Sequence, residues 1–435
     1  MAAGISRHLA RLLFLLCLSG TSPAAMTATL LDCGQVLDVE RGRWATQQRI
    51  RVEAGKITQV DTASQLPAQA GDTVVDLRHL NCLPGLMDMH VHFSVEFGPR
   101  TYLERFQLNA ADIALRSVAY AERTLMAGFT TVRDLGDSYN SSISLKRAIA
   151  ENRVLGPRIF AAGKSLATTG GHADPTNGMR DDLTPPATPG NGVLNGVAQA
   201  REAVRQRYKD GADLIKITAT GGVLSVAASG DNAQFQMDEL EAVVETARDY
   251  GFHVAAHAHG AEGMKRAIRA GVASIEHGTY MDAEAIKLMK RNGTWYVPTI
   301  MAGHWVAAKS RIEGFFPELV RPKAAAVGPK IHATFRRAHE AGVKIAYGTD
   351  SGVSAHGDNA QEFALMIEGG MEPVEALRAA TVHAAELLGQ SKQLGQIRPD
   401  YLADIIAVAG DPLRDPQALQ AVRMVMKQGQ IVRRP

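Results

Sequence analysis

The chain has 435 residues, of which 46% are hydrophobic and 21% are charged, a composition that is ordinary for a soluble globular protein. It contains no run of 18 or more apolar residues, so no transmembrane helix is predicted. The formal net charge of +2 falls to zero without the two basic residues of the first 25 positions. A surface with balanced charge gives no reason to expect nucleic acid or a membrane as a partner.

The first 25 residues differ from the rest of the chain. Arg7 and Arg11 precede the apolar run LLFLLCLSG, and the small residues of TSPAA follow it. This order is typical of a secretory signal peptide, with cleavage near Ala24 or Ala25. We therefore predict a periplasmic or secreted protein. If translation instead begins at Met26, the same chain would be cytoplasmic.

Residues 26–84 contain short apolar runs separated by turns, among them TATLLDCGQVLDV and DTVVDL. Residues 392–435 resume this pattern in YLADIIAVAG and VRMVMKQGQIV. Such runs are typical of β-strands, and we predict that both ends of the chain build one small β-sandwich domain. After cleavage of the leader, Cys33 and Cys82 remain, and an export compartment would permit one disulfide.

The middle of the chain, residues 85–391, alternates apolar runs with helical patterns such as SVAYAERTLMAG and MDELEAVVETARDYG. Eight strand-like runs can be distinguished: GLMDMHVHF, FTTVRDLG, RIFAAGKSL, LIKITAT, HVAAHAHG, SIEHGTY, WYVPTI and KIAYGTDSG. Eight strand–helix units in about 300 residues are what a (β/α)8 TIM barrel needs. A doubly wound open sheet is the competing layout, but it would not bring eight strand ends around one site.

Two segments are too long to be plain connections. Residues 171–192 follow the third predicted strand, and residues 301–323 follow the seventh. Loops after barrel strands lie on the face where active sites form, so both are candidate lids or substrate walls. Trp305, Phe315 and Phe316 in the second segment are interpreted either as an apolar substrate wall or as helix packing.

Polar side chains gather at the ends of the predicted barrel strands. The run LPGLMDMHVHFS places Asp88, His90 and His92 at alternate positions, and therefore on one face of a strand. Lys216 lies inside the fourth run, where a lone ammonium group is costly to bury, and Asp350 ends the eighth. Because the carboxyl ends of barrel strands surround one pocket, we expect a metal centre there. The histidines near these ends are His90, His92, His172, His257, His259 and His277.

This arrangement resembles the amidohydrolase superfamily of metal-dependent hydrolases over nearly the whole mature chain. The resemblance lies in PGLMDMHVH, in the split β domain and in the closing GQIRPDYLADIIAV. It implies two divalent metal ions, with zinc well suited to the ligands, and N6-carboxylysine at Lys216, the strand-four lysine. The metal ligands implied by the resemblance are His90, His92, Lys216, His257, His277 and Asp350.

Two metal ions about 3.5–4 Å apart would share a hydroxide and polarise a carbonyl oxygen. Asp350 would ligate a metal, accept the proton of the bridging water and donate it to the leaving amine. At the fifth strand, HAHG offers both His257 and His259, and HGAE resembles the motif of single-metal deaminases with Glu262 as proton shuttle. Lys216 argues against that interpretation, so His257 is assigned as the ligand, and His259 either to the pocket wall or to the residues that support the ligands.

Within the superfamily, the likeness is to the prolidase-like dipeptidase branch and the ochratoxin-degrading amidases. The segment SLATTGGHADP resembles the Gly-Gly-His turn of that branch, which implies that His172 is catalytic and binds the scissile carbonyl oxygen. The TGGVLS segment offers backbone N–H groups of Gly221, Gly222 and Val223 that could hold a carboxylate. Further candidate substrate contacts are His259, Ser94 and Tyr280.

The resulting hypothesis is a hydrolase that cleaves the amide bond of N-acyl amino acids or dipeptides, including ochratoxin A. Its partners would be a small-molecule amide and, by the same resemblance, further copies of the chain in a homo-oligomer. Two alternatives share the fold: an imidazolonepropionase-like cyclic-amide hydrolase and a single-metal deaminase. A non-enzymatic alternative is a periplasmic metal-binding protein, which would need saturated coordination.

Overall fold

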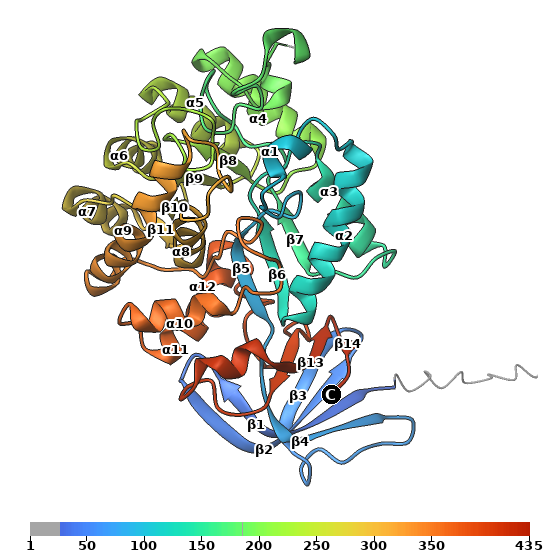
Figure 1. The fold of residues 1–435 in the computed structure, drawn as a ribbon. Coiled ribbons are helices and arrows are strands. Elements are labelled where there is room, and N and C mark those ends of the chain that lie inside the picture. Colours follow the sequence, from blue (N-terminus) through green and yellow to red (C-terminus); the bar gives the residue numbers. More distant parts are fainter. Residues whose placement is uncertain (1–26, 185) are drawn as a thin grey trace, which may run out of the picture.

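The computed structural model describes residues 27–184 and 186–435, and the predicted signal peptide lies outside these residues. Two parts are joined directly: a β domain at the bottom of Figure 1 and a larger α/β part above it. Within the described ranges, no helix is long and apolar enough to cross a membrane.

The β domain is built from both ends of the chain, as predicted. Hydrogen bonds link seven strands into one mixed sheet in the order β14-β13-β12-β4-β1-β2-β3. The C-terminal strands join this sheet through antiparallel pairing of β12 with β4, while β1 and β4 run parallel. The strands are β1 (Thr29–Asp38), β2 (Arg43–Glu53), β3 (Lys56–Thr62), β4 (Thr73–Pro84), β12 (Ile405–Val408), β13 (Val422–Lys427) and β14 (Gln430–Arg433).

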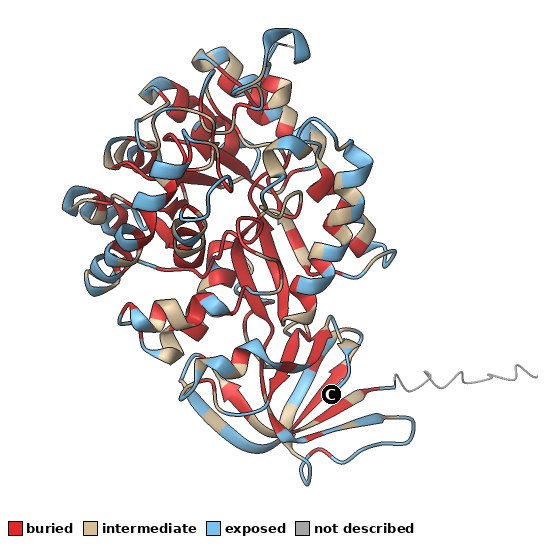
Figure 2. Ribbon diagram, in the orientation of Figure 1, coloured by how far each residue is buried: buried red, intermediate tan, exposed pale blue. Residues whose placement is uncertain are grey.

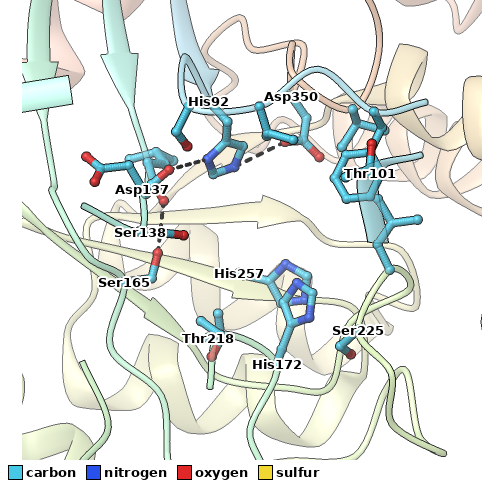
Figure 3. Close-up of a pocket in the computed structure, with 18 of the residues that line it drawn as sticks. His92, Thr101, Asp137, Ser138, Ser165, His172, Thr218, Ser225, His257 and Asp350 are labelled. Atoms are coloured by element: carbon cyan, nitrogen blue, oxygen red, sulfur yellow. Dashed lines mark hydrogen bonds and ion pairs between the residues drawn. The ribbon is translucent and has the colours of Figure 1, made fainter. Parts of the chain in front are cut away.

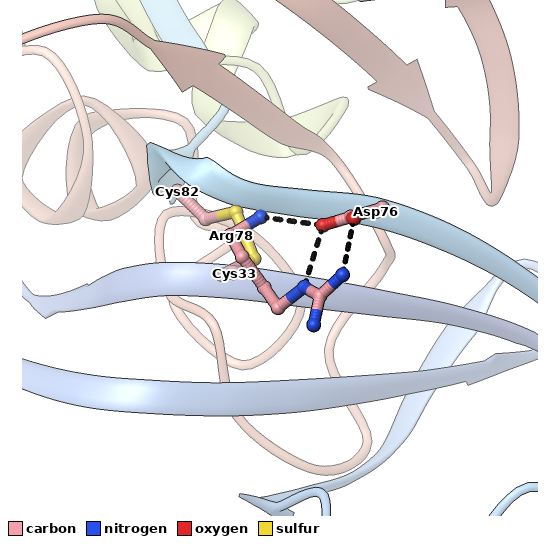
Figure 4. The surroundings of a disulfide bond; sticks show 4 residues. All are labelled: Cys33, Asp76, Arg78 and Cys82. Carbon is pink, nitrogen blue, oxygen red and sulfur yellow. Dashed lines mark hydrogen bonds and ion pairs between the residues drawn. A yellow bond between two sulfur atoms is a disulfide. The ribbon is translucent and has the colours of Figure 1, made fainter.

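A disulfide between Cys33 and Cys82 ties β1 to β4 inside this sheet (Figure 4). Both cysteines are buried in a cluster of aliphatic side chains that includes Leu31, Ile50 and Leu77. The bond joins the first strand of the domain to the strand that leads into the barrel.

Parallel strands form the core of the α/β part, and helices lie outside them (Figures 1 and 2). Two hydrogen-bonded groups occur, β5-β6-β7 and β8-β9-β10-β11. Parallel bridges join the groups at Leu166–Ile217 and connect the eighth segment at Tyr296–Ile345 and Val91–Ser351. The (β/α)8 barrel is therefore confirmed. Its strands are β5 (Leu86–Val91), β6 (Phe129–Asp134), β7 (Arg158–Ala161), β8 (Ile215–Thr218), β9 (Val254–Ala258), β10 (Ser274–His277) and β11 (Trp295–Val297).

The two ends of α7 show the local chemistry expected at helix termini. For α7, the Asp282 side chain accepts a hydrogen bond from the Ala285 amide at 2.8 Å, and Gly293 ends the helix with φ of 69°. The helices are α1 (Thr101–Glu104), α2 (Ala110–Met126), α3 (Ser141–Ala150), α4 (Gly196–Asp210), α5 (Met237–Asp249), α6 (Ala261–Ala270), α7 (Ala283–Asn292), α8 (Ile300–Lys309), α9 (Arg321–Glu340), α10 (Gln361–Glu368), α11 (Pro373–Ala379) and α12 (Val382–Leu387).

A single glycine lies at the first of the two crossings between the β domain and the barrel. Gly85 separates β4 from β5, and a Cβ atom at this position would lie 2.2 Å from Oγ1 of Thr130. Only glycine therefore permits the close packing of β5 on β6 here. The strand that follows carries His90, so this contact helps to fix the entry into the site.

Candidate metal and active site

A cavity of about 670 Å³ opens at the carboxyl ends of the barrel strands (Figure 3). This is the face on which barrel enzymes carry their active sites. Most of the residues predicted from the sequence line it, namely His90, His92, Ser94, His172, Lys216, Val223, His257, His259, His277 and Asp350.

The predicted ligands lie together at the base of this cavity. Ligand-capable atoms of His90, His277 and Asp350 all lie within 4.8 Å of one another. Nε2 of His92 is 3.3 Å from Oδ1 of Asp350, and Nζ of Lys216 is 3.5 Å from Nε2 of His90. Three strands (β5, β8 and β10) and the eighth segment thus direct nitrogen and oxygen atoms to one place.

Three of the predicted ligand histidines each have one ring nitrogen held by a neighbouring oxygen. Nδ1 of His90 lies 2.9 Å from Oε2 of Glu276, and Nδ1 of His92 lies 2.9 Å from the carbonyl of Gly136. Nδ1 of His277 lies 2.7 Å from Oγ1 of Thr299. A hydrogen bond from Nδ1–H to an oxygen fixes the tautomer of the ring. The lone pair of Nε2 is then free to coordinate a metal. These imidazoles therefore fit a metal ion.

The fifth-strand histidines are oriented differently from one another. Nε2 of His257 donates to the carbonyl of Gly221 at 3.1 Å, which leaves Nδ1 as its free nitrogen. Nδ1 of His259 instead lies 2.7 Å from Oγ1 of Thr279. The His257 ring centre is 4.7 Å from that of His277 and 4.6 Å from that of His259. Both side chains line the cavity, so His259 lies beside the predicted ligand His257.

Two of the predicted ligands, His277 and Asp350, have a strained backbone. His277 has φ of 68° and Asp350 has φ of 59°, in the left-handed region that such residues rarely adopt. Thr299, the hydrogen-bond partner of His277, has φ of 51°. Strain of this kind concentrates at functional sites. It also explains why the eighth segment makes isolated bridges rather than a regular strand.

The charges in the site influence one another. Burial lowers the pKa of Lys216 to about 8, which raises the share of neutral, nucleophilic amine above that of an exposed lysine. Burial opposes ionisation of Asp350, but the nearby His90, His92 and Lys216 hold its pKa below the usual range. Burial holds the pKa values of His90, His257 and His277 well below their usual range, so these imidazoles are neutral at neutral pH. Burial also opposes a charge on His92, but its hydrogen bond with Asp350 raises its pKa above the usual value. A carboxylate beside neutral imidazoles is a donor set that binds a divalent metal.

A family model of the amidohydrolase family matches residues 81–432, most of the chain. The chain belongs to the amidohydrolase family. An ochratoxinase from Aspergillus niger is 36% identical over 373 residues, covering 81% of this chain and 76% of the relative. Together with the structural relatives, this shows a hydrolase that acts on amide bonds.

Solved structures agree with this assignment. A Xaa-Pro dipeptidase with bound methionine superposes with a TM-score of 0.91 at 51% identity, over 94% of this chain and all of the other. The A. niger ochratoxinase structure superposes with a TM-score of 0.82 at 29% identity, over 94% of this chain and 96% of the other. The predicted prolidase-like and ochratoxinase branch of the superfamily is therefore confirmed.

An amidohydrolase site needs oriented ligands, and the sequence did not reveal what orients His90. Glu276, which precedes His277, is fully buried and joins His90 to Arg133, whose Nη2 donates to Oε1 of Glu276 at 2.8 Å. Arg133 is also fully buried, and burial lowers its pKa. Asp88 has a comparable role: its carboxylate accepts hydrogen bonds from Thr349, beside Asp350.

The ring of His172 fills a space that is open only because residue 222 is a glycine. Its ring centre lies 4.4 Å from that of His257 (Figure 3), and a Cβ on Gly222 would lie 2.2 Å from His172 Nδ1. Burial lowers the pKa of His172 to about 3, so the ring is neutral at physiological pH. Gly222 thus supports His172 rather than lining the cavity.

Three predicted substrate contacts do not line the cavity: Gly221, Gly222 and Tyr280. The Gly221 amide already donates to the carbonyl of Asn232 at 3.0 Å, so it is not free to hold a carboxylate. For Trp305, Phe315 and Phe316, helix packing is the correct interpretation. Their rings pack on one another and do not line the cavity.

The mouth of the cavity contains residues that sequence reasoning missed. They come from residues 95–120, between β5 and the middle of α2, and no spacing or motif marks them. Tyr102 donates its hydroxyl to the carbonyl of Leu224 at 2.9 Å, which joins this segment to the loop after β8. The apolar residues here are Val95, Phe97, Tyr102, Leu108, Ile113 and Tyr120.

Proposed function

We propose that this amidohydrolase is a binuclear metalloenzyme that cleaves the amide bond of dipeptides or N-acyl amino acids. The observation that carries the proposal is the convergence of six donor side chains on one cavity, with Lys216 beside His90. Zinc suits this donor set. Carboxylation of Lys216 would turn a buried cation into an anionic ligand able to reach both ions. The ligands would be His90, His92, Lys216, His257, His277 and Asp350.

Two bound cations would polarise the scissile carbonyl and lower the pKa of water in the site. The chain's own residues supply the proton transfers. Asp350, held ionised by its neighbours, takes the proton of the attacking water and returns it to the leaving nitrogen. His172 is neutral and contributes an N–H to the carbonyl oxygen as negative charge develops there.

The relatives and the cavity together favour a substrate whose leaving group is an amino acid. The similar proteins are a Xaa-Pro dipeptidase and an ochratoxinase. A volume of about 670 Å³ with an apolar mouth accommodates a bulky acyl or aminoacyl group. We therefore propose Xaa-Pro dipeptides and ochratoxin A as substrates, with release of free proline or phenylalanine.

The test is a panel of Xaa-Pro dipeptides, other dipeptides and ochratoxin A, with free amino acid as the product measured. Turnover should disappear after chelation and return with zinc. Imidazolonepropionate serves as the competing substrate of the alternative hydrolase. Turnover of that compound alone, or turnover that survives complete removal of metal, would overturn the proposal.

Export and self-association complete the proposal. The N-terminal leader pattern and the Cys33–Cys82 disulfide support a periplasmic or secreted location, because disulfides persist in oxidising compartments. Mass spectrometry of the protein from its native cell fractions would locate the mature N-terminus. Light scattering would measure whether the chain forms the homo-oligomer that the family resemblance implies.

A further inference from the structure

One lysine outside the cavity forms hydrogen bonds to the loop that follows β8. Lys323 lies in the first turn of α9, and its Nζ donates to three backbone carbonyls: Gly222 at 3.1 Å, Ser225 at 2.9 Å and Ala227 at 2.7 Å. These carbonyls belong to the loop of residues 219–236, between β8 and α5. Three acceptors satisfy all three protons of an ammonium group.

The position of this charge is unfavourable unless the loop compensates for it. A cation at a helix N-terminus opposes the helix dipole, and Lys323 is the third residue of α9. Within residues 27–184 and 186–435, no carboxylate forms a salt bridge with it. Burial also lowers the pKa of Lys323. The three carbonyls are therefore what stabilises the ammonium group here.

Three groups of this loop, residues 219–236, contact residues of the site. The Gly221 carbonyl accepts the Nε2 proton of His257, which turns Nδ1 toward the cavity. Gly222 leaves the space that the His172 ring fills. The Leu224 carbonyl accepts the hydroxyl of Tyr102 at the cavity mouth. Each of these groups lies within three residues of a carbonyl that Lys323 holds.

We propose that Lys323 is a positioning residue, which acts through residues 221–227 to hold His257 and His172 in their working orientations. This inference rests on the proposed function, which assigns a metal to His257 and the carbonyl oxygen to His172. Lys323 is not among the residues that line the cavity. The ammonium group of Lys323 thereby connects α9 to the proposed ligand His257, to His172 and to Tyr102 at the mouth of the cavity.

The experiment compares Lys323→Met, Lys323→Arg and the control Lys330→Met. Lys330 is an exposed residue of the same helix. Hydrogen exchange of residues 219–236 is measured on the metal-free full-length protein, followed by zinc affinity, kcat and KM. Loss of such supporting contacts lowers metal affinity or activity about 10–100-fold.

We expect Lys323→Met to speed exchange in this loop and to lower zinc affinity and kcat by about 10-fold or more, with a smaller change in KM. Arginine should restore part of the loss, because it keeps the charge but not the three convergent bonds. Lys330→Met should match wild type. If the methionine variant does not fold, Lys323→Gln replaces it in the same comparison.

Wild-type loop exchange in Lys323→Met would overturn the inference, and so would a loss of activity without faster exchange. Failure of the proposed function would look different. Wild-type protein would then release no amino acid from the panel, while loop exchange and zinc affinity would still report on Lys323.

Discussion

Replacing Glu276 by glutamine removes one negative charge below the site and nearly preserves the shape of the side chain. The fully buried Arg133 donates to the carbonyl of Met89 at 2.7 Å, to Oγ of Ser274 at 3.1 Å and to Oε1 of Glu276 at 2.8 Å. Glu276 is the charged member of these three acceptors. The variant leaves a buried cation without its counter-ion, which costs about 3–5 kcal/mol of folding free energy.

The assay is urea unfolding of metal-free wild type and Glu276→Gln at neutral pH, followed by zinc titration. Because Glu276 also holds Nδ1 of His90, we expect zinc affinity to fall about 10–100-fold. Glu386→Gln is the control: its partner Lys344 lies 2.8 Å away, both side chains are half exposed, and the expected change is within about 1 kcal/mol. A Glu276→Gln protein as stable as this control, with wild-type zinc affinity, would contradict both roles of Glu276, as the counter-ion of Arg133 and as the partner of His90.

Three further predictions use the same protein. Asp350→Asn should lower kcat about 10²–10⁴-fold by removing the proton acceptor, and near-normal turnover would contradict that role. Gly222→Ala should displace the His172 ring and lower kcat/KM while the protein still folds; a crystal structure with an unmoved ring would disprove it. Burial lowers the pKa of His253 and His356 to about 4. Because the unfolded chain binds their protons from about pH 6.5 downward, metal-free protein should unfold at lower urea at pH 5 than at pH 7, and equal midpoints would contradict this.

The barrel and the convergence of these side chains on one cavity could be predicted because their signals are local and repeat. Each strand is a short apolar run, and parallel strand ends meet at one face, so His90, Lys216, His257 and Asp350 could be brought together without coordinates. The eighth segment was also predicted, although its left-handed Asp350 leaves it with isolated bridges.

What could not be predicted depends on contacts between distant residues. The pairing of Arg133 with Glu276 spans 143 positions, and a lone buried carboxylate carries no mark of its partner. The Gly-Gly pair indicated a backbone that binds an anion, whereas Gly222 makes room for the ring of His172. Lys323 was part of a segment interpreted as a lid or wall, and its three carbonyl partners lie about 100 residues earlier.

The proposed function depends on Lys216 being carboxylated and helping to hold two metal ions in this cavity. Anomalous diffraction from crystals of active, zinc-loaded enzyme tests it most directly, together with metal analysis of the same preparation. The proposed binuclear site predicts two zinc ions per chain, with extra density on Nζ of Lys216 that reaches both ions. One ion per chain beside an unmodified lysine, in protein that hydrolyses the substrate panel, would contradict it.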